Sequence, residues 1–157
     1  FEAPFTYPFG DYSVRGVIDR IDEDGEGREV LIDYKAKSTP SFDSIMAYEA
    51  MQLAMYAGAR RFIDKKVVSL EYVSIEKGTE SVMLRNVEDA GGYYRLRKER
   101  GLSKEEFASF LDGAEKALQE AIDSMVAGDF PAEPNNENVC GYCDFVDLCR
   151  KESLCFD

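Results

Sequence analysis

A short apolar run that ends in an acid and an amine, Val30-Leu31-Ile32-Asp33-Tyr34-Lys35, most constrains what this chain can fold into. The run predicts a strand, in which side chains two residues apart point to the same face, so Asp33 and Lys35 should project together. A carboxylate can hold a divalent cation against a phosphate oxygen, and an ammonium group beside it can orient water or stabilise developing charge. The pattern therefore indicates phosphodiester chemistry, although an isolated D-x-K also fits an edge strand with an exposed ion pair.

Composition limits the possible functions. The 157 residues are 45% hydrophobic and 32% charged, which is ordinary for a globular domain with a proper core. Without an apolar run of roughly 18 residues or a basic-then-apolar leader, we expect a cytoplasmic protein with no membrane association. The net charge of −12 argues against a generally nucleic-acid-binding surface, but not against a local basic track or a metal site. Because the chain opens on Phe1 in an aromatic segment, we expect a fragment of a longer polypeptide.

Paired strands are predicted before and within the D-x-K run. Residues 1–10 read as an extended segment lying on the body of the fold, and residues 11–22 alternate as a strand. A glycine-rich turn then leads into the strand that ends at Lys35, so the two strands should form an antiparallel hairpin that brings Asp19 near Asp33. Two acids and a lysine would suit Mg²⁺, which prefers oxygen ligands and keeps several waters.

A helix is expected from about residue 43 to about residue 63, with a broad apolar stripe that packs on a sheet. Gln52 and Tyr56 are four residues apart and would lie one above the other on this helix. They are candidate site residues, although the pair also fits an ordinary amphipathic helix.

The second half of the chain predicts further strands and one long helix. Residues 67–75 and 80–85 read as strands, which gives an α/β fold with a mixed sheet of about four strands flanked by helices. The capping box Ser103-Lys104-Glu105-Glu106 starts a helical pattern that runs to about Ala127 and ends at Gly128.

One stretch of this acidic chain, residues 93–104, is locally basic and aromatic. Arg95, Arg97 and Lys98 are candidates for contact with a phosphate backbone, and the neighbouring aromatics could stack on bases. A solvated linker or helix face is the alternative interpretation, because charge runs are usually solvated.

All cysteines lie in the tail, as Cys140, Cys143, Cys149 and Cys155, with the spacing C-x2-C-x5-C-x5-C. This clustering favours a metal or cluster site over a disulfide framework. A zinc site usually has two close pairs of ligands, whereas iron–sulfur clusters tolerate irregular spacing. Reduced structural cysteines in a small cap remain an alternative. We expect a core over residues 1–130 and a cysteine-rich tail over residues 131–157.

In order along the chain, three motifs resemble those of RecB-type nucleases of the PD-(D/E)XK superfamily. They are G-x-x-D-R-I-D at residues 16–22, D-Y-K at residues 33–35 and Q-x-x-x-Y at residues 52–56. The cysteine spacing is similar to the cluster-binding tail of AddB-type helicase–nuclease subunits and of CRISPR-associated iron–sulfur exonucleases.

The resemblance implies a restriction-endonuclease-like core and assigns a role to each motif residue. Asp19, Asp33 and the backbone carbonyl of Tyr34 would bind Mg²⁺ or Mn²⁺, and Lys35 would orient water or stabilise the transition state. Gln52 and Tyr56 would position Lys35 or the DNA backbone, and Cys140, Cys143 and Cys149 would hold three corners of a [4Fe-4S] cluster.

The implied activity is that of a metal-dependent DNA exonuclease in double-strand break processing and recombinational repair. Its partners would be DNA, the rest of a larger polypeptide and a helicase–nuclease partner subunit. The family carries a further metal ligand on an upstream helix, and this chain contains no His, so we expect weak or no cleavage by the isolated domain. Only Cys155 could supply a fourth cluster ligand. A non-catalytic DNA-binding or scaffold module of the same fold, and a zinc-ribbon interaction domain, are the alternatives.

Overall fold

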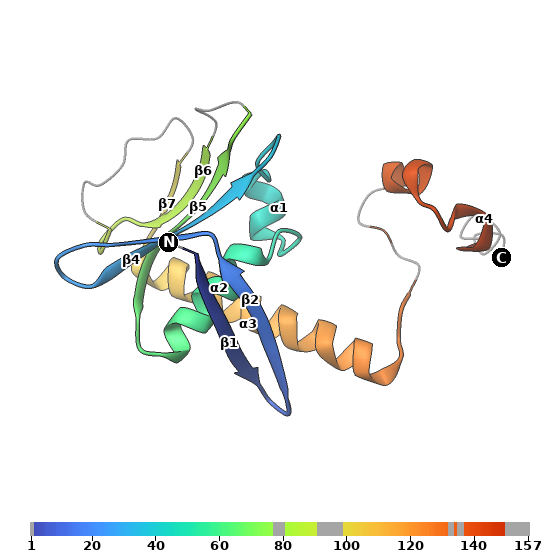
Figure 1. The fold of residues 1–157 in the computed structure, drawn as a ribbon, viewed down its shortest axis with the longest axis horizontal. Helices are drawn as coiled ribbons and strands as arrows, with labels where there is room; N and C mark the ends of the chain where they lie inside the picture. Colours follow the sequence, from blue (N-terminus) through green and yellow to red (C-terminus); the bar gives the residue numbers. More distant parts are fainter. Residues whose placement is uncertain (1, 77–80, 91–98, 132–133, 135–136, 150–157) are drawn as a thin grey trace. The chain divides into compact units, whose positions relative to one another are not determined.

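The computed structural model describes residues 2–76, 81–90, 99–131, 134 and 137–149 (Figure 1). The chain divides into two units, residues 1–120 and 121–157, and each is described by itself. In chain order the elements are β1 (Ala3–Phe9), β2 (Tyr12–Ile18), β3 (Arg20–Glu23), β4 (Arg28–Lys35), α1 (Phe42–Met46), α2 (Gln52–Phe62), β5 (Lys66–Ser74), β6 (Ser81–Asn86), β7 (Glu99–Leu102), α3 (Lys104–Ala127), η1 (Glu137–Tyr142) and α4 (Val146–Cys149).

A mixed sheet in the order β3-β4-β5-β6-β7 forms the centre of the first unit. The pairs β4–β5 and β6–β7 are parallel, and β3–β4 and β5–β6 are antiparallel. The predicted α/β architecture with a mixed sheet is confirmed. The sheet has five described strands instead of about four, because β7 forms from the end of the basic stretch, whose residues do not alternate between polar and apolar. Since β4 lies between β3 and β5, the alternative of an edge strand is wrong.

The single strand expected over residues 11–22 is broken at Asp19. Its first part, β2, pairs with β1 in a separate two-stranded ribbon, and its second part, β3, pairs with β4 (Figure 1). At the break, the Asp19 side chain accepts a hydrogen bond from the backbone N–H of Tyr34 at 2.8 Å. The antiparallel pairing with the D-x-K strand is confirmed, and Arg20 lies opposite Ile32. Asp19 and Asp33 each lie one residue beyond this pair.

The single helix expected over residues 43–63 is two helices, α1 and α2. The chain turns at Tyr48, where φ is +60°, a left-handed conformation that bulky residues rarely adopt. The Tyr48 ring stacks on Phe110 of α3 with centroids 5.6 Å apart, and its hydroxyl lies over Gly113, where a larger residue would leave no room. Packing against α3 therefore holds the break.

The ends of α3 follow the sequence prediction. Ser103 Oγ accepts from the Glu106 N–H at 3.1 Å and Glu106 Oε2 accepts from the Ser103 N–H at 2.8 Å, which is a reciprocal capping box. At the other end Gly128 has a φ of +74°, and the Asp129 N–H reaches the Ser124 carbonyl at 2.9 Å. This is a Schellman termination, in which glycine carries the left-handed conformation.

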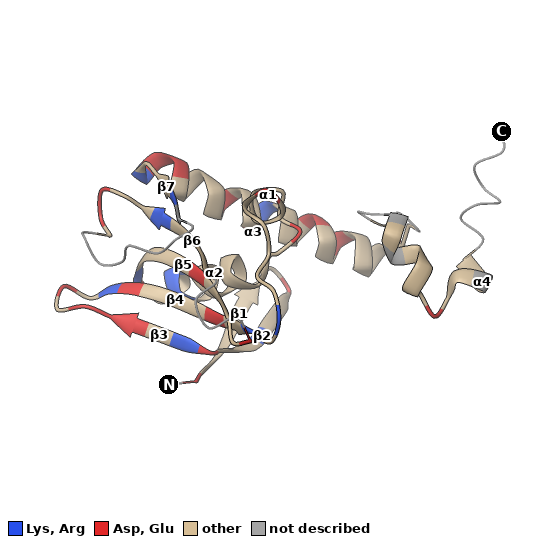
Figure 2. Cartoon of the chain, turned by 90° about the horizontal axis from the view of Figure 1, so that it is seen from above, with Lys and Arg blue, Asp and Glu red and all other residues tan. Residues whose placement is uncertain are grey.

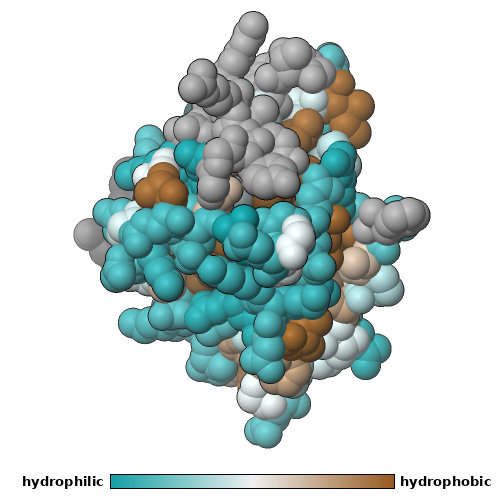
Figure 3. All heavy atoms as spheres, turned by 90° about the vertical axis from the view of Figure 1, so that its left-hand side faces the viewer, coloured by the Kyte–Doolittle hydropathy of each residue, from teal (hydrophilic) through white to brown (hydrophobic). Residues whose placement is uncertain are grey.

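The core lies between one face of the sheet and the helices α2 and α3. Sheet residues such as Leu31, Leu70 and Leu84 pack there against helix residues such as Leu53 and Phe107. Polar and charged groups cover much of the outside. Blue and red segments alternate on β3 and β4 (Figure 2), and hydrophilic atoms dominate the face shown in Figure 3. In the described part of the chain, no helix is long and apolar enough to cross a membrane.

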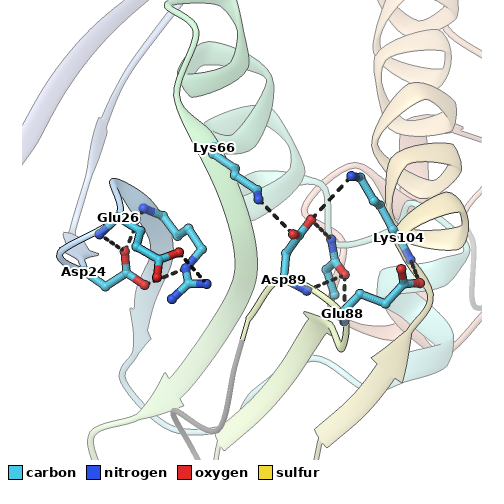
Figure 4. Close-up of polar contacts among 8 residues, drawn as sticks. Asp24, Glu26, Lys66, Glu88, Asp89 and Lys104 are labelled. Carbon is cyan, nitrogen blue, oxygen red and sulfur yellow. Dashed lines mark hydrogen bonds and ion pairs between the residues drawn. The ribbon is translucent and has the colours of Figure 1, made fainter.

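A polar cluster forms around the turn that follows β6, at Glu88 and Asp89. Asp89 Oδ1 lies 2.8 Å from Lys66 Nζ, and Asp89 Oδ2 lies 3.9 Å from Lys104 Nζ (Figure 4). Glu88 Oε1 accepts from the Lys104 N–H at 3.0 Å, at the start of α3. The Lys66 and Asp89 side chains are 52% and 20% exposed, so this ion pair is more accessible to water than the pair of Lys35 and Asp33, whose side chains are 30% and 1% exposed.

Candidate active site

Strand β4 directs Asp33 and Lys35 to the core face of the sheet, toward α2. Lys35 Nζ lies 2.8 Å from Asp33 Oδ2. Asp33 is 1% exposed, whereas 30% of the Lys35 side chain remains accessible. The two side chains share one face, as the alternation predicts, and they form a buried ion pair instead of an exposed one.

The first turns of α2 extend this contact. Lys35 Nζ donates to Gln52 Oε1 at 2.6 Å, and Gln52 Nε2 donates to the Tyr56 hydroxyl at 2.7 Å. Tyr56 is 5% exposed, and its ring meets Phe5 of β1 edge to face with centroids 5.7 Å apart. Gln52 is the first residue of α2, so its side-chain amide reaches Lys35 of β4 from the start of the helix. The structure therefore joins Asp33, Lys35, Gln52 and Tyr56 in one chain of contacts.

Asp19 lies at the bend between β2 and β3, next to Asp33 in the register of the β3–β4 pair. Its bond to the Tyr34 N–H ties the bend to the D-x-K strand. Burial raises the pKa of Asp33 and of Tyr56, and the negative charge of Asp19 adds to both shifts. The bend thus brings the second predicted acid beside the first.

Burial dominates the electrostatics of Asp33. Removal from water raises the pKa of the Asp33 carboxyl, the adjacent Lys35 ammonium lowers it, and the Asp19 carboxylate raises it further. Asp33 Oδ2 is buried and accepts no well-aligned hydrogen bond from the described residues, so the Lys35 charge is its compensation. A second cation placed between Asp33 and Asp19 would relieve their mutual repulsion.

The donor set fits a hydrated Mg²⁺ ion better than a fully caged metal. Across the described ranges, no three His, Cys, Asp or Glu side chains are placed to hold an ion together. Asp19 and Asp33 offer two carboxylates, and Mg²⁺ is commonly bound by one or two carboxylates while waters and substrate oxygens complete its shell. The role of the Tyr34 carbonyl as a further ligand stays a prediction.

The remaining predicted site residues lie outside the described residues or in the second unit. Arg95, Arg97 and Lys98, the predicted DNA contacts, lie outside the described residues, as does Cys155. Cys140 is half-buried and Cys143 and Cys149 are exposed, and all three are free thiols. Cys143 Sγ accepts from the Phe145 N–H at 3.4 Å. Among the described residues, these three thiols do not form a group that could hold a metal ion together.

Sequence reasoning missed Tyr72 of β5. Its ring centroid lies 5.3 Å from Lys35 Nζ, and its Cα is paired with that of Asp33 across the parallel strands β4 and β5. The alternation of residues 67–75 gives the face on which Tyr72 lies. The register that sets it beside Asp33 depends on the connection through α1 and α2, which no local pattern reveals.

Comparison with known proteins gives one match. The family model of the PD-(D/E)XK nuclease superfamily matches residues 1–150, which is nearly the whole chain. No curated protein and no solved structure matches the chain significantly.

Proposed function

Because the chain belongs to the PD-(D/E)XK nuclease superfamily, we propose that it hydrolyses phosphodiester bonds of DNA at the site formed by Asp19, Asp33 and Lys35. The observation that supports this most is the placement of Lys35. Its ammonium group lies between the Asp33 carboxylate and the Gln52 amide oxygen, while part of its side chain stays accessible to a substrate.

Each residue has a distinct task in this proposal. Asp19 and Asp33 hold a divalent cation, Mg²⁺ or Mn²⁺, which when bound neutralises phosphate charge and makes water more acidic. Lys35 orients the attacking water or stabilises negative charge that develops on the phosphate. Gln52 fixes the direction of the Lys35 ammonium group, and Tyr56 fixes Gln52 in turn.

The ordered motifs support a finer assignment. We propose a RecB-type exonuclease of the AddB kind that acts from DNA ends during double-strand break repair, as part of a larger polypeptide that works with a helicase–nuclease partner subunit in the cytoplasm. The support is the succession of the three motifs at Asp19, at Asp33 to Lys35 and at Gln52 to Tyr56, each at the expected place in the chain.

A non-catalytic module of the same fold is the second candidate. Two observations favour it: the net charge of −12, and the lack of a third acid or His beside Asp19 and Asp33 among the described residues. The candidates differ in what they require of Lys35: in a scaffold its ammonium group only balances the buried Asp33 carboxylate, so its removal would lower stability without any effect on cleavage.

Cleavage of linear DNA in Mg²⁺ or Mn²⁺ by the full polypeptide that carries this domain separates the two candidates. We expect metal-dependent cleavage that Lys35→Ala lowers by at least about a hundredfold, in the range that removal of one transition-state stabilising group produces. Lys66→Ala, which removes a lysine from the Asp89 pair, should cleave like the unaltered polypeptide. Equal cleavage by Lys35→Ala, or no metal-dependent cleavage by the unaltered polypeptide, would favour the non-catalytic module.

For the tail, we propose that Cys140, Cys143 and Cys149 belong to an iron–sulfur site whose assembly requires them to move together. Protein purified without oxygen should then contain iron and sulfide. Zinc in place of iron would support a zinc-ribbon tail, and the absence of both would mean that the cysteines are structural.

A further inference from the structure

Tyr72 contacts two parts of the proposed active site, the Lys35 ammonium group on β4 and the start of α2. Its side chain is fully buried, at 1% exposure, so it cannot contact DNA itself. On the sheet side, the face of its ring lies 5.3 Å from Lys35 Nζ, within the range at which an aromatic ring attracts a cation. The ring therefore adds a third neighbour to the Lys35 ammonium group, after the Asp33 carboxylate and the Gln52 amide oxygen.

On the helix side, the Tyr72 hydroxyl makes hydrogen bonds at the start of α2. It donates to the Ala50 carbonyl at 3.1 Å and accepts from the Leu53 N–H at 3.4 Å. The first N–H groups of a helix lack partners within the helix, and a side-chain oxygen at the N-cap position usually accepts from one of them. In α2 the N-cap residue is Met51, which makes no side-chain cap. The Tyr72 hydroxyl supplies the missing acceptor from another element.

This cap acts next to a proposed site residue. Leu53 directly follows Gln52, the first residue of α2 and the one that contacts Lys35. The hydroxyl thus fixes the end of the helix from which the Gln52 amide reaches the ammonium group, and the ring of the same residue lies beneath that group.

The hydroxyl keeps its proton under ordinary conditions. Burial raises the pKa of Tyr72 to about 12, and the nearby Asp33 carboxylate adds to this effect. A protonated hydroxyl can donate to Ala50 and accept from Leu53 at the same time. The hydrogen bonds that join β5 to the start of α2 require only this protonated form of the hydroxyl.

We propose that Tyr72 is a positioning residue for phosphodiester hydrolysis: its hydroxyl sets the start of α2, and with it Gln52, while its ring supports the Lys35 ammonium group. The kinetic part of this inference rests on the proposed function, whereas the structural part can be measured without any substrate.

Tyr72→Phe tests the hydroxyl, with Tyr7→Phe as the matched control. Tyr7 is also a buried tyrosine, its hydroxyl donates to Glu115 at 3.2 Å, and it lies away from Lys35. In the free protein we expect faster amide hydrogen exchange at Leu53 and shifted side-chain amide resonances of Gln52 for Tyr72→Phe, and neither change for Tyr7→Phe. Unchanged exchange at Leu53 in Tyr72→Phe would overturn the capping role.

Tyr72→Leu tests the ring. Protons above an aromatic face resonate upfield, so the Lys35 side-chain methylene resonances should move downfield in Tyr72→Leu and stay close to their original positions in Tyr72→Phe. Unmoved Lys35 resonances in Tyr72→Leu, with the domain folded, would overturn the role of the ring.

Kinetics then test the effect on hydrolysis. Tyr72→Phe should lower kcat by about tenfold to a hundredfold, the range that a small misplacement of a catalytic group produces, with KM unchanged because Tyr72 is buried. Equal loss of kcat in Tyr72→Phe and Tyr7→Phe would overturn a specific positioning role. Full activity of Lys35→Ala would refute the proposed function instead, and the exchange and resonance measurements would still decide what Tyr72 holds in place.

Discussion

Replacing Lys35 by Met removes the cation beside a buried carboxylate and keeps most of the aliphatic stem. In the unaltered chain Lys35 Nζ lies 2.8 Å from Asp33 Oδ2, and Asp33 is 1% exposed. The variant must either keep an ionised Asp33 without its partner or bind a proton there. We therefore expect the variant to be less stable at neutral pH, for a reason unrelated to its lost activity.

The size of the effect follows from the burial of the two groups. Breaking a fully buried ion pair by removing one partner costs about 3–5 kcal/mol. Lys35 is 30% exposed, so water already screens part of the attraction, and Asp33 can take up a proton when the ion is lost. We expect a loss of about 2 kcal/mol in the free energy of unfolding at pH 7.5. The exposed control Lys66→Met should lose at most about 1 kcal/mol.

The dependence on pH identifies the cause. Burial raises the pKa of Asp33 while Lys35 lowers it, so removal of Lys35 raises this pKa further. The loss of stability is present where Asp33 is ionised in the unaltered chain, and it shrinks as the pH falls and the carboxyl becomes neutral. Urea unfolding from pH 8 to pH 5, above the pI of about 4.5, measures this trend. A loss that is zero, or that does not change with pH, would refute the reasoning.

Three further predictions concern the fold. Arg60→Met should lower the free energy of unfolding by about 3 kcal/mol, because it leaves Glu29, which is 0% exposed, with Lys65 at 3.8 Å as its one cationic partner among the described residues; a loss below about 1 kcal/mol in urea unfolding would contradict this. Burial raises the pKa of Glu71 above that of the unfolded chain, so the protein loses stability as the pH rises from the unfolded pKa to the folded pKa of this carboxyl. Glu71→Gln should therefore become more stable relative to the unaltered chain over this pH interval. Parallel pH profiles of the two proteins would contradict this prediction. Gly128→Ala should cost about 1 kcal/mol because φ is +74°, and an unchanged Tm would show that the helix end adapts.

Local sequence patterns predicted those features that depend on neighbouring residues. The capping box and terminal glycine of α3 act within a few residues, and both form as expected. The shared face of Asp33 and Lys35 follows from the alternation of any strand. The spacing of Gln52 and Tyr56 follows from one helical turn, and their side chains meet at 2.7 Å.

Features set by distant residues were not predicted. Tyr48 breaks the expected helix because it packs on Phe110 of α3, far along the chain. Asp19 breaks the expected strand where its carboxylate binds the Tyr34 N–H. In both places the neighbouring residues favour the expected helix or strand, and a contact formed only in the folded state overrides this preference.

The apolar stripe expected on the helix over residues 43–63 also differs from the buried face of α2. Phe62, an apolar residue of the expected stripe, is 58% exposed, whereas Ala54 and Ala57 are buried in the core cluster. Hydrophobicity alone gives little weight to alanine, and the burial of these two residues was therefore not predicted.

If Asp19 and Asp33 bind a divalent cation beside Lys35, as we propose, a Mn²⁺ titration followed by NMR will detect it. The paramagnetic ion broadens resonances near its site even when binding is weak. We expect selective broadening around Asp19, Asp33 and the Tyr34 amide, abolished by Asp33→Asn and preserved in the control Asp89→Asn. Uniform broadening, or broadening that persists in Asp33→Asn, would contradict this proposal.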